Sequence, residues 1–348
     1  MISQSTSTCQ EIGYKLVDKD ERGRDRQWSL RKKSTMLLAD ICQYAGLEKR
    51  AAALRGCSTY LEFAVTEEGL KLHQANFCRE RLCPMCAWRR SRKIYGHMSR
   101  IMAAIAAGDR NIQYVMLTLT CRSVQGAELR AALDAMVKAW DRLCKRKRIK
   151  SAVAGWYRGI EITRDTDEFI TAARYAAGKS YYSSRGLSVG DKNPNFGLYH
   201  PHIHCLLAVE PSYFAGKSYI KQSDWVDLWQ SALGADYSPV VDVRRVRGQT
   251  VRAAAEVAKY ASKPGDYIQA DDVDLSADTV RTLDAALKGR RLVAYGGLLR
   301  DMHKALNLDD EETGDLVQTD EEAAAADAIL TVTYVFNTGY NEYYLMGF

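Results

Sequence analysis

The sequence predicts an α+β protein: a layer of antiparallel strands with helices packed on one face, plus a small Cys-rich zinc-binding module. Two observations carry this prediction. β-rich runs interleave with helical periods, and no Gly-rich turn of a dinucleotide-binding fold joins them. Four cysteines gather in one basic segment. With 348 residues, 47% hydrophobic and 26% charged, the chain is long and apolar enough to bury a large core.

The expected elements follow one another along the chain. Runs rich in β-forming residues predict strands at 114–120, 155–163, 202–209, 239–246, 328–336 and 342–346. Apolar residues at intervals of three or four predict helices at 31–55, 127–143, 223–233 and 250–263. Residues 165–197 are expected to form an inserted loop. Residues 309–322 carry eight acidic and no basic side chains, so a mobile linker is expected there.

The overall composition favours a cytoplasmic protein that binds a polyanion. No apolar run reaches the length of a membrane span, and the first residues lack the layout of a signal peptide. Basic side chains cluster at 79–100, 142–150 and 244–252, although any one cluster alone could be ordinary solvated surface. Together they favour nucleic acid as the partner.

The nine cysteines are expected to be reduced thiols or metal ligands, because nothing indicates secretion. Four of them have the spacing of a structural zinc site: Cys57, Cys78, Cys83 and Cys86. The alternative is a set of free thiols in which only the Cys83–Cys86 pair is close. Three arginines follow the last cysteine and would suit contact with a phosphate backbone: Arg89, Arg90 and Arg92.

A second metal site is predicted where "HPHIHCLL" enters a strand at residues 200–207. Side chains alternate along a strand, so His202 and His204 project from one face and could share a divalent cation. Mg²⁺ and Mn²⁺ favour oxygen, and Glu161, between two isoleucines in a predicted strand, is the preferred third ligand. His200 competes for that position. The alternative is a pair of structural histidines.

The predicted helix at 250–263 holds a candidate nucleophile. Glu256 and Tyr260 are four residues apart on one face, with Lys263 a turn further on. A phenol has a pKa of about 10, so a nearby cation would be needed to favour phenolate. A tyrosine oxygen that attacks phosphorus forms a covalent intermediate, and Glu256 could act as a base. Taken alone, the pattern also fits an ordinary helix with a Glu–Tyr contact.

Three stretches in this order resemble the motifs of the HUH endonucleases: "MLTLT" at 116–120, "HPHIHCLL" at 200–207 and "KYASK" at 259–263. The sequence is most similar to plasmid rolling-circle replication initiator (Rep) proteins with a single catalytic tyrosine. The segments "FCRERLCPMCAWRRSRK", "IEIT" and "ALKGRRLVAYGG" support the resemblance, which covers about residues 55–300.

The resemblance implies a metal-dependent, site-specific single-strand DNA endonuclease and strand transferase of a prokaryotic cytoplasm. Tyr260 would nick one strand at the plasmid's double-strand origin, the free 3′-OH would prime synthesis, and Glu256 would act in the terminating cleavage. Mg²⁺ or Mn²⁺ would bind at the histidines and structural Zn²⁺ at the cysteines. Origin DNA, a host helicase and a DNA polymerase would be the partners.

Four segments are expected on this basis: a helical or flexible start (1–55), the zinc module (56–100), the HUH endonuclease domain (101–270), and a C-terminal helical region with the acidic linker and a strand pair (271–348). Two other functions stay open. One is a relaxase or single-strand transposase of the same superfamily. The other is a non-catalytic, zinc-containing DNA-binding regulator.

Overall fold

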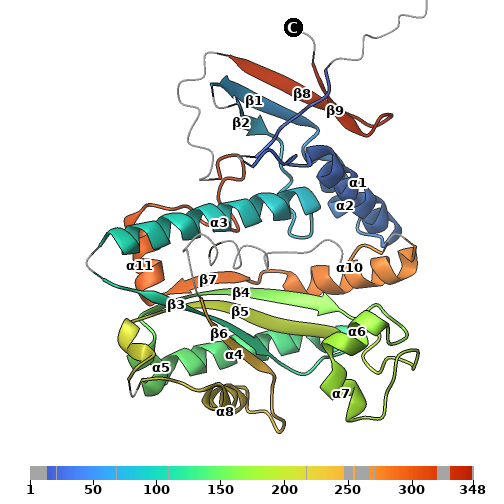
Figure 1. Ribbon diagram of the computed structural model, residues 1–348. Coiled ribbons are helices and arrows are strands. Elements are labelled where there is room, and N and C mark those ends of the chain that lie inside the picture. Colours follow the sequence, from blue (N-terminus) through green and yellow to red (C-terminus); the bar gives the residue numbers. More distant parts are fainter. Residues whose placement is uncertain are drawn as a thin grey trace, which may run out of the picture. The chain divides into compact units, whose positions relative to one another are not determined.

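The computed structural model describes residues 14–346 except 21, 68, 109, 217, 247–253, 255–266, 270 and 320–329. The chain divides into two compact units, unit 1 (1–89 and 315–348) and unit 2 (90–314) (Figure 1). The predicted helix at 250–263 lies almost wholly outside the described residues, and so do its Glu256, Tyr260 and Lys263. Among the described residues, no helix is long and apolar enough to cross a membrane.

Unit 2 is built on a five-stranded antiparallel sheet in the order β6-β3-β5-β4-β7. Its strands are β3 (Gln113–Thr120), β4 (Gly155–Arg164), β5 (Tyr199–Val209), β6 (Val241–Arg245) and β7 (Val293–Gly296). The first four coincide with the strands predicted for this region. β5, which carries the three neighbouring histidines, is the central strand, and ten of its eleven residues are buried.

Helices cover both faces of this sheet (Figure 1). On one face, the part of α3 (Pro84–Ala107) that belongs to unit 2 and α11 (Gly297–Ala305) pack on Tyr157, Leu206 and Ala208. On the other face, Trp140 of α4 (Leu129–Lys145) meets Trp156 edge-on, with ring centroids 5.1 Å apart. The α+β class is confirmed. The expectation of helices on one face only is wrong, because alternate residues of β4 and β5 are apolar on both sides.

The remaining helices of unit 2 lie in the segments between these strands. They are α5 (Lys147–Ala152), α6 (Ala172–Ala177), α7 (Lys179–Ser183), α8 (Gln222–Leu233) and α10 (Val273–Leu287). The stretch predicted as an inserted loop thus contains two short helices, α6 and α7. α4 carries its apolar side chains at intervals of three and four, which is why six of its residues are buried along one side.

Unit 1 joins the two ends of the described chain in one sheet. Its helices are α1 (Trp28–Tyr44) and α2 (Glu48–Gly56), and its strands are β1 (Tyr60–Thr66), β2 (Gly69–Ala75), β8 (Thr331–Asn337) and β9 (Glu342–Leu345). The strand order is β2-β1-β8-β9, so an early strand pairs with a late one (Figure 1). This grouping differs from the four predicted segments, because antiparallel pairing of β1 with β8 places the C-terminal strand pair with the Cys-rich region.

The acidic stretch is not a mobile linker over its described part, residues 309–319. Glu311, Leu316 and Thr319 are at most 1% exposed. The guanidinium of Arg89 donates to the carbonyl oxygens of Leu316 and Val317, at 2.8 and 2.7 Å. Arg89 is itself fully buried. Its predicted contact with a phosphate backbone is therefore wrong, because its charge is used to hold residues 316–319 within unit 1.

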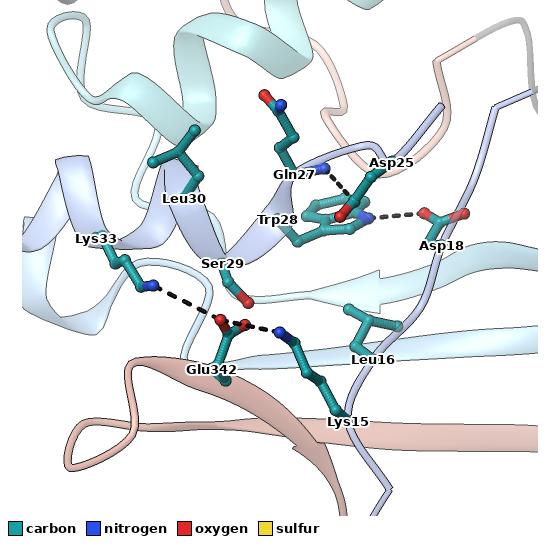
Figure 2. A pocket seen from close by; sticks show the side chains of 10 residues that line it. All are labelled: Lys15, Leu16, Asp18, Asp25, Gln27, Trp28, Ser29, Leu30, Lys33 and Glu342. Carbon is teal, nitrogen blue, oxygen red and sulfur yellow. Dashed lines mark hydrogen bonds and ion pairs between the residues drawn. The ribbon is translucent and has the colours of Figure 1, made fainter. Parts of the chain in front are cut away.

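A pocket of about 220 Å³ lies in unit 1 beside the start of α1 (Figure 2). Glu342 of β9 lies between Lys15 and Lys33, at 3.1 and 3.6 Å. At the other end of the pocket, Trp28 donates its indole N–H to Asp18 at 2.7 Å. The pair of Lys15 with Glu342 fixes the first described residues against β9.

Candidate active site and metal centres

The histidine motif forms a compact three-residue group with Glu161. β4 pairs with β5 so that Glu161 lies opposite His202 and Gly159 opposite His204, which places all three functional side chains on the same sheet face. Glu161 Oε2 lies 3.0 Å from His202 Nε2 and 2.8 Å from His204 Nε2. The three residues are between 5% and 9% exposed, so this is a nearly buried set of one carboxylate and two imidazoles.

The outer nitrogens of both rings have partners that orient them. His202 Nδ1 lies 3.1 Å from the backbone oxygen of His200, and a carbonyl can only accept, so Nδ1 carries the proton. His204 Nδ1 lies 3.2 Å from the hydroxyl of Thr118, which is opposite it on β3. In the neutral ring of His202 the Nε2 lone pair then faces Glu161, and His204 takes the same tautomer if the Thr118 hydroxyl accepts its Nδ1–H. A carboxylate oxygen and a bare imidazole nitrogen at this distance need a proton or a metal cation between them.

The separations suit a divalent cation. Octahedral Mg²⁺ has ligands at about 2.1 Å, which puts neighbouring ligand atoms about 3.0 Å apart. The two Glu161–histidine distances, 3.0 and 2.8 Å, agree with that spacing. These residues fit an ion that keeps the remaining coordination positions for water or substrate oxygen.

His200 lies apart from this group. The donor atoms that lie within 4.8 Å of one another belong to Glu161, His202 and His204. His200 Nδ1 instead lies 3.2 Å from the Ser123 hydroxyl, with its ring centroid 5.6 Å from that of His202. Burial, aided by the charge of His202, lowers the pKa of His200 to about 4. His200 is therefore a neutral ring beside the cluster and not a fourth member of it.

The four cysteines form a second candidate centre, in unit 1. Their sulfur atoms all lie within 4.8 Å of one another. The pairs Cys57–Cys86, Cys57–Cys83 and Cys78–Cys86 are 3.6, 3.6 and 3.7 Å apart. Tetrahedral zinc with Zn–S bonds of about 2.3 Å requires sulfur separations of about 3.8 Å. The set therefore fits structural Zn²⁺ in both ligand type and spacing.

Local structure brings these cysteines together. Cys57 ends α2, Cys78 follows β2, and Cys83 and Cys86 flank the first residues of α3. The buried ammonium of Lys32 donates to the carbonyl oxygens of Arg55 and Cys57, at 2.9 and 2.6 Å. Burial lowers the pKa of Lys32, and the neighbouring thiols oppose this effect only in part. A cation at this position offsets the negative charge that four thiolates leave around one Zn²⁺.

Sequence reasoning missed the side chains that support each centre. Thr118 could have been found, because the threonines of "MLTLT" alternate with leucines and so share the histidine face of β3. Lys32 could not, because nothing in α1 marks one lysine as buried.

Known proteins are similar to this chain over most of its length. Residues 69–344 match the model of a family described as "Replication protein". The chain belongs to this replication protein family. Curated relatives named "Protein rep" include one from Bacillus amyloliquefaciens, 37% identical over 88% of this chain and 90% of its own length. Another, from Streptococcus pneumoniae, is 33% identical over 95% of both chains. No solved structure matches.

Membership of the replication protein family confirms the resemblance to Rep initiators that the motifs predicted. The match extends well beyond the histidine stretch, since it includes both β2 and β9 of unit 1. The Cys-rich module is therefore largely inside the family region rather than an unrelated addition.

Proposed function

We propose that this replication protein is a plasmid replication initiator that nicks one strand at the double-strand origin and primes rolling-circle replication. The observation that carries the proposal is the convergence of Glu161, His202 and His204 on one sheet face, with carboxylate–imidazole distances of 2.8 and 3.0 Å. A purely structural histidine pair would not need a buried glutamate between its rings, since burying that charge is costly.

In the proposed reaction, the phenolic oxygen of Tyr260 attacks the scissile phosphorus and forms a phosphotyrosyl ester with the 5′ end. The bond from phosphorus to the 3′ oxygen breaks, the phenolic proton is lost to solvent or a base, and the 3′ oxygen leaves protonated as a primer for synthesis. A divalent cation held by Glu161, His202 and His204 would polarise the scissile phosphate. Lys263 would favour the phenolate.

Termination would use a second cleavage. Glu256 would accept a proton from an incoming water or hydroxyl, which then attacks phosphorus at the regenerated origin, so that the bond to the 3′ oxygen breaks and a new 3′-OH is released. Transfer of the strand from Tyr260 to the new 3′-OH closes the circle and restores the free tyrosine. The ester bond conserves the energy of the original phosphodiester, so no nucleotide cofactor is needed for rejoining.

The surface of unit 2 supplies charge for origin DNA. Around the end of α4 and in α5, basic side chains stay exposed, among them Arg142, Lys145, Lys147, Arg148 and Lys150. Arg148 is paired with Asp224, and no acidic residue lies within the 142–150 run itself. This part of the predicted basic surface suits phosphate contacts, which position DNA without reading its sequence.

The test uses the full chain, Mn²⁺ and a single-stranded oligonucleotide that carries the origin. We expect a covalent protein–DNA adduct that denaturing gels and mass spectrometry detect. Tyr260→Phe should abolish it, and Glu161→Gln should abolish it while leaving DNA binding intact. Tyr219→Phe, at a side chain that is 46% exposed, is the matched control and should form adduct normally.

Each alternative gives a distinct result. A non-catalytic DNA-binding regulator would bind the oligonucleotide and form no adduct with any of these chains. Full nicking by Tyr260→Phe would overturn the assigned nucleophile. Normal release of single-stranded circles by Glu256→Ala would remove Glu256 from termination.

A further inference from the structure

Unit 2 contains a second group of two histidines and a glutamate, away from the first. His97 of α3 and His303 of α11 converge on Glu311, which follows α11 in the chain. Glu311 Oε1 lies 2.9 Å from His97 Nδ1 and 3.0 Å from His303 Nε2. His97 is 2% and Glu311 1% exposed, so the interaction is buried.

A second carboxylate lies on the other side of the His97 ring. Asp309 Oδ1 lies 3.3 Å from His97 Nε2, on the opposite side of the ring from Glu311. An imidazole that donates Nε2–H to a carboxylate presents a bare Nδ1, the arrangement found behind metal-bound histidines. The bare Nδ1 then faces a carboxylate oxygen at 2.9 Å, and a positive charge between them is required.

We propose that His97, His303 and Glu311 bind a divalent transition-metal ion of the zinc class. The donor set of two imidazoles and one carboxylate is one that zinc and its neighbours accept. The distances of 2.9 and 3.0 Å match those of the Glu161 group and the spacing of about 3.0 Å between neighbouring ligands at 2.1 Å from an ion.

Two further buried oxygens lie beside the ligands. They are Glu311 Oε2 and the Tyr295 hydroxyl, and the contact between these two side chains is not a hydrogen bond of ordinary geometry. They are close enough to influence each other electrostatically, and the Tyr295 ring lies 4.9 Å from that of His303. A bound ion could be coordinated by Oε2 as well as by Oε1 of Glu311. A further coordination position at the ion would then be open to the Tyr295 hydroxyl or to water.

The role of such an ion is to hold the segment after α11 in place. That segment runs from residue 306 to 314 and leads back into unit 1. Lys93 of α3 also pairs with Asp309 there, so two links join the segment to the same helix. Metal binding would replace the buried contacts of Glu311 with His97 and His303, which depend on a protonated imidazole, by coordination bonds. The proposal does not depend on Tyr260 or on nicking.

The test measures metal stoichiometry in the full chain. Protein freed of loosely bound metal is titrated with ZnCl2, passed through a desalting column, and analysed for zinc by mass spectrometry. His303→Ala and Glu311→Gln should each bind one equivalent fewer than the wild type. His73→Ala removes a half-exposed histidine of unit 1 and should bind the full amount. Circular dichroism checks that each variant is folded.

A second measurement needs no variant. Wild-type crystals soaked in ZnCl2 and measured at the zinc absorption edge should show an anomalous peak between His97, His303 and Glu311. Equal stoichiometry in wild type and variants, or no peak at this position, would overturn the proposal. The cluster would then be held by a proton on His97.

Discussion

Thr118 provides the sharpest test of how the candidate active site is oriented. Its hydroxyl lies 3.2 Å from His204 Nδ1, on the ring's far side from Glu161. Thr118→Val keeps the shape of the side chain but removes the hydroxyl that contacts His204. The ring then loses the contact that directs its Nε2 toward the metal position.

The expected magnitude follows from two estimates. Loss of one neutral hydrogen bond costs about 1 kcal/mol, or roughly fivefold in affinity. Loss of an outer-shell partner of a metal-bound histidine typically costs about 10- to 100-fold in metal affinity. We therefore expect Mn²⁺ to bind Thr118→Val about 10-fold more weakly, which corresponds to about 1.4 kcal/mol.

Isothermal titration with Mn²⁺ measures this directly. Thr118→Ser, which keeps the hydroxyl, is the matched control. It should bind Mn²⁺ within about twofold of wild type, because the hydrogen bond to His204, worth about 1 kcal/mol, is retained. Wild-type affinity in Thr118→Val would refute the role given to the hydroxyl. Absence of Mn²⁺ binding in the wild type would instead refute the centre itself, so the two failures can be told apart.

Three further results are expected. Cys86→Ser should lose its zinc and lower the melting temperature of unit 1, whereas Cys42→Ser, which alters a buried thiol outside the cluster, should keep its zinc in metal analysis. Lys32→Met should lower the free energy of unfolding by about 1–3 kcal/mol for each carbonyl that loses its donor. Competition with a chelator should show that this variant retains zinc more weakly. Trp140→Ala should destabilise unit 2 by about 3–5 kcal/mol in urea unfolding; an unchanged midpoint would contradict burial of α4 on the sheet.

The sequence predicted what local pattern encodes. The alternation of histidines on β5 placed His202 and His204 on one face, and an acidic residue between isoleucines identified Glu161. Both inferences rest on the period of a strand, which needs no knowledge of distant residues. The structure then added the register, in which Glu161 lies opposite His202.

What could not be predicted depends on contacts between distant segments. Arg89 reads as a surface charge because its neighbours are basic, yet its partners are carbonyl oxygens of residues 316 and 317. His97 and Glu311 are likewise separated by most of unit 2, and no periodicity relates them. Long-range partners of buried charges have no local signature, and this is why residues 309–319 differ from the mobile linker that their composition predicts.

The pairing of β1 with β8 has a consequence for biosynthesis. β1 and its partner β8 are far apart in the chain, so β1 leaves the ribosome well before β8 is made. At about 5–20 residues per second this delay is roughly 15–50 s, during which the backbone groups of β1 that face β8 have no strand partner. Residues 90–314 form one uninterrupted unit and can fold in the meantime. The sheet of unit 1, next to the Cys-rich region, can thus be completed only after β8 and β9 have been made.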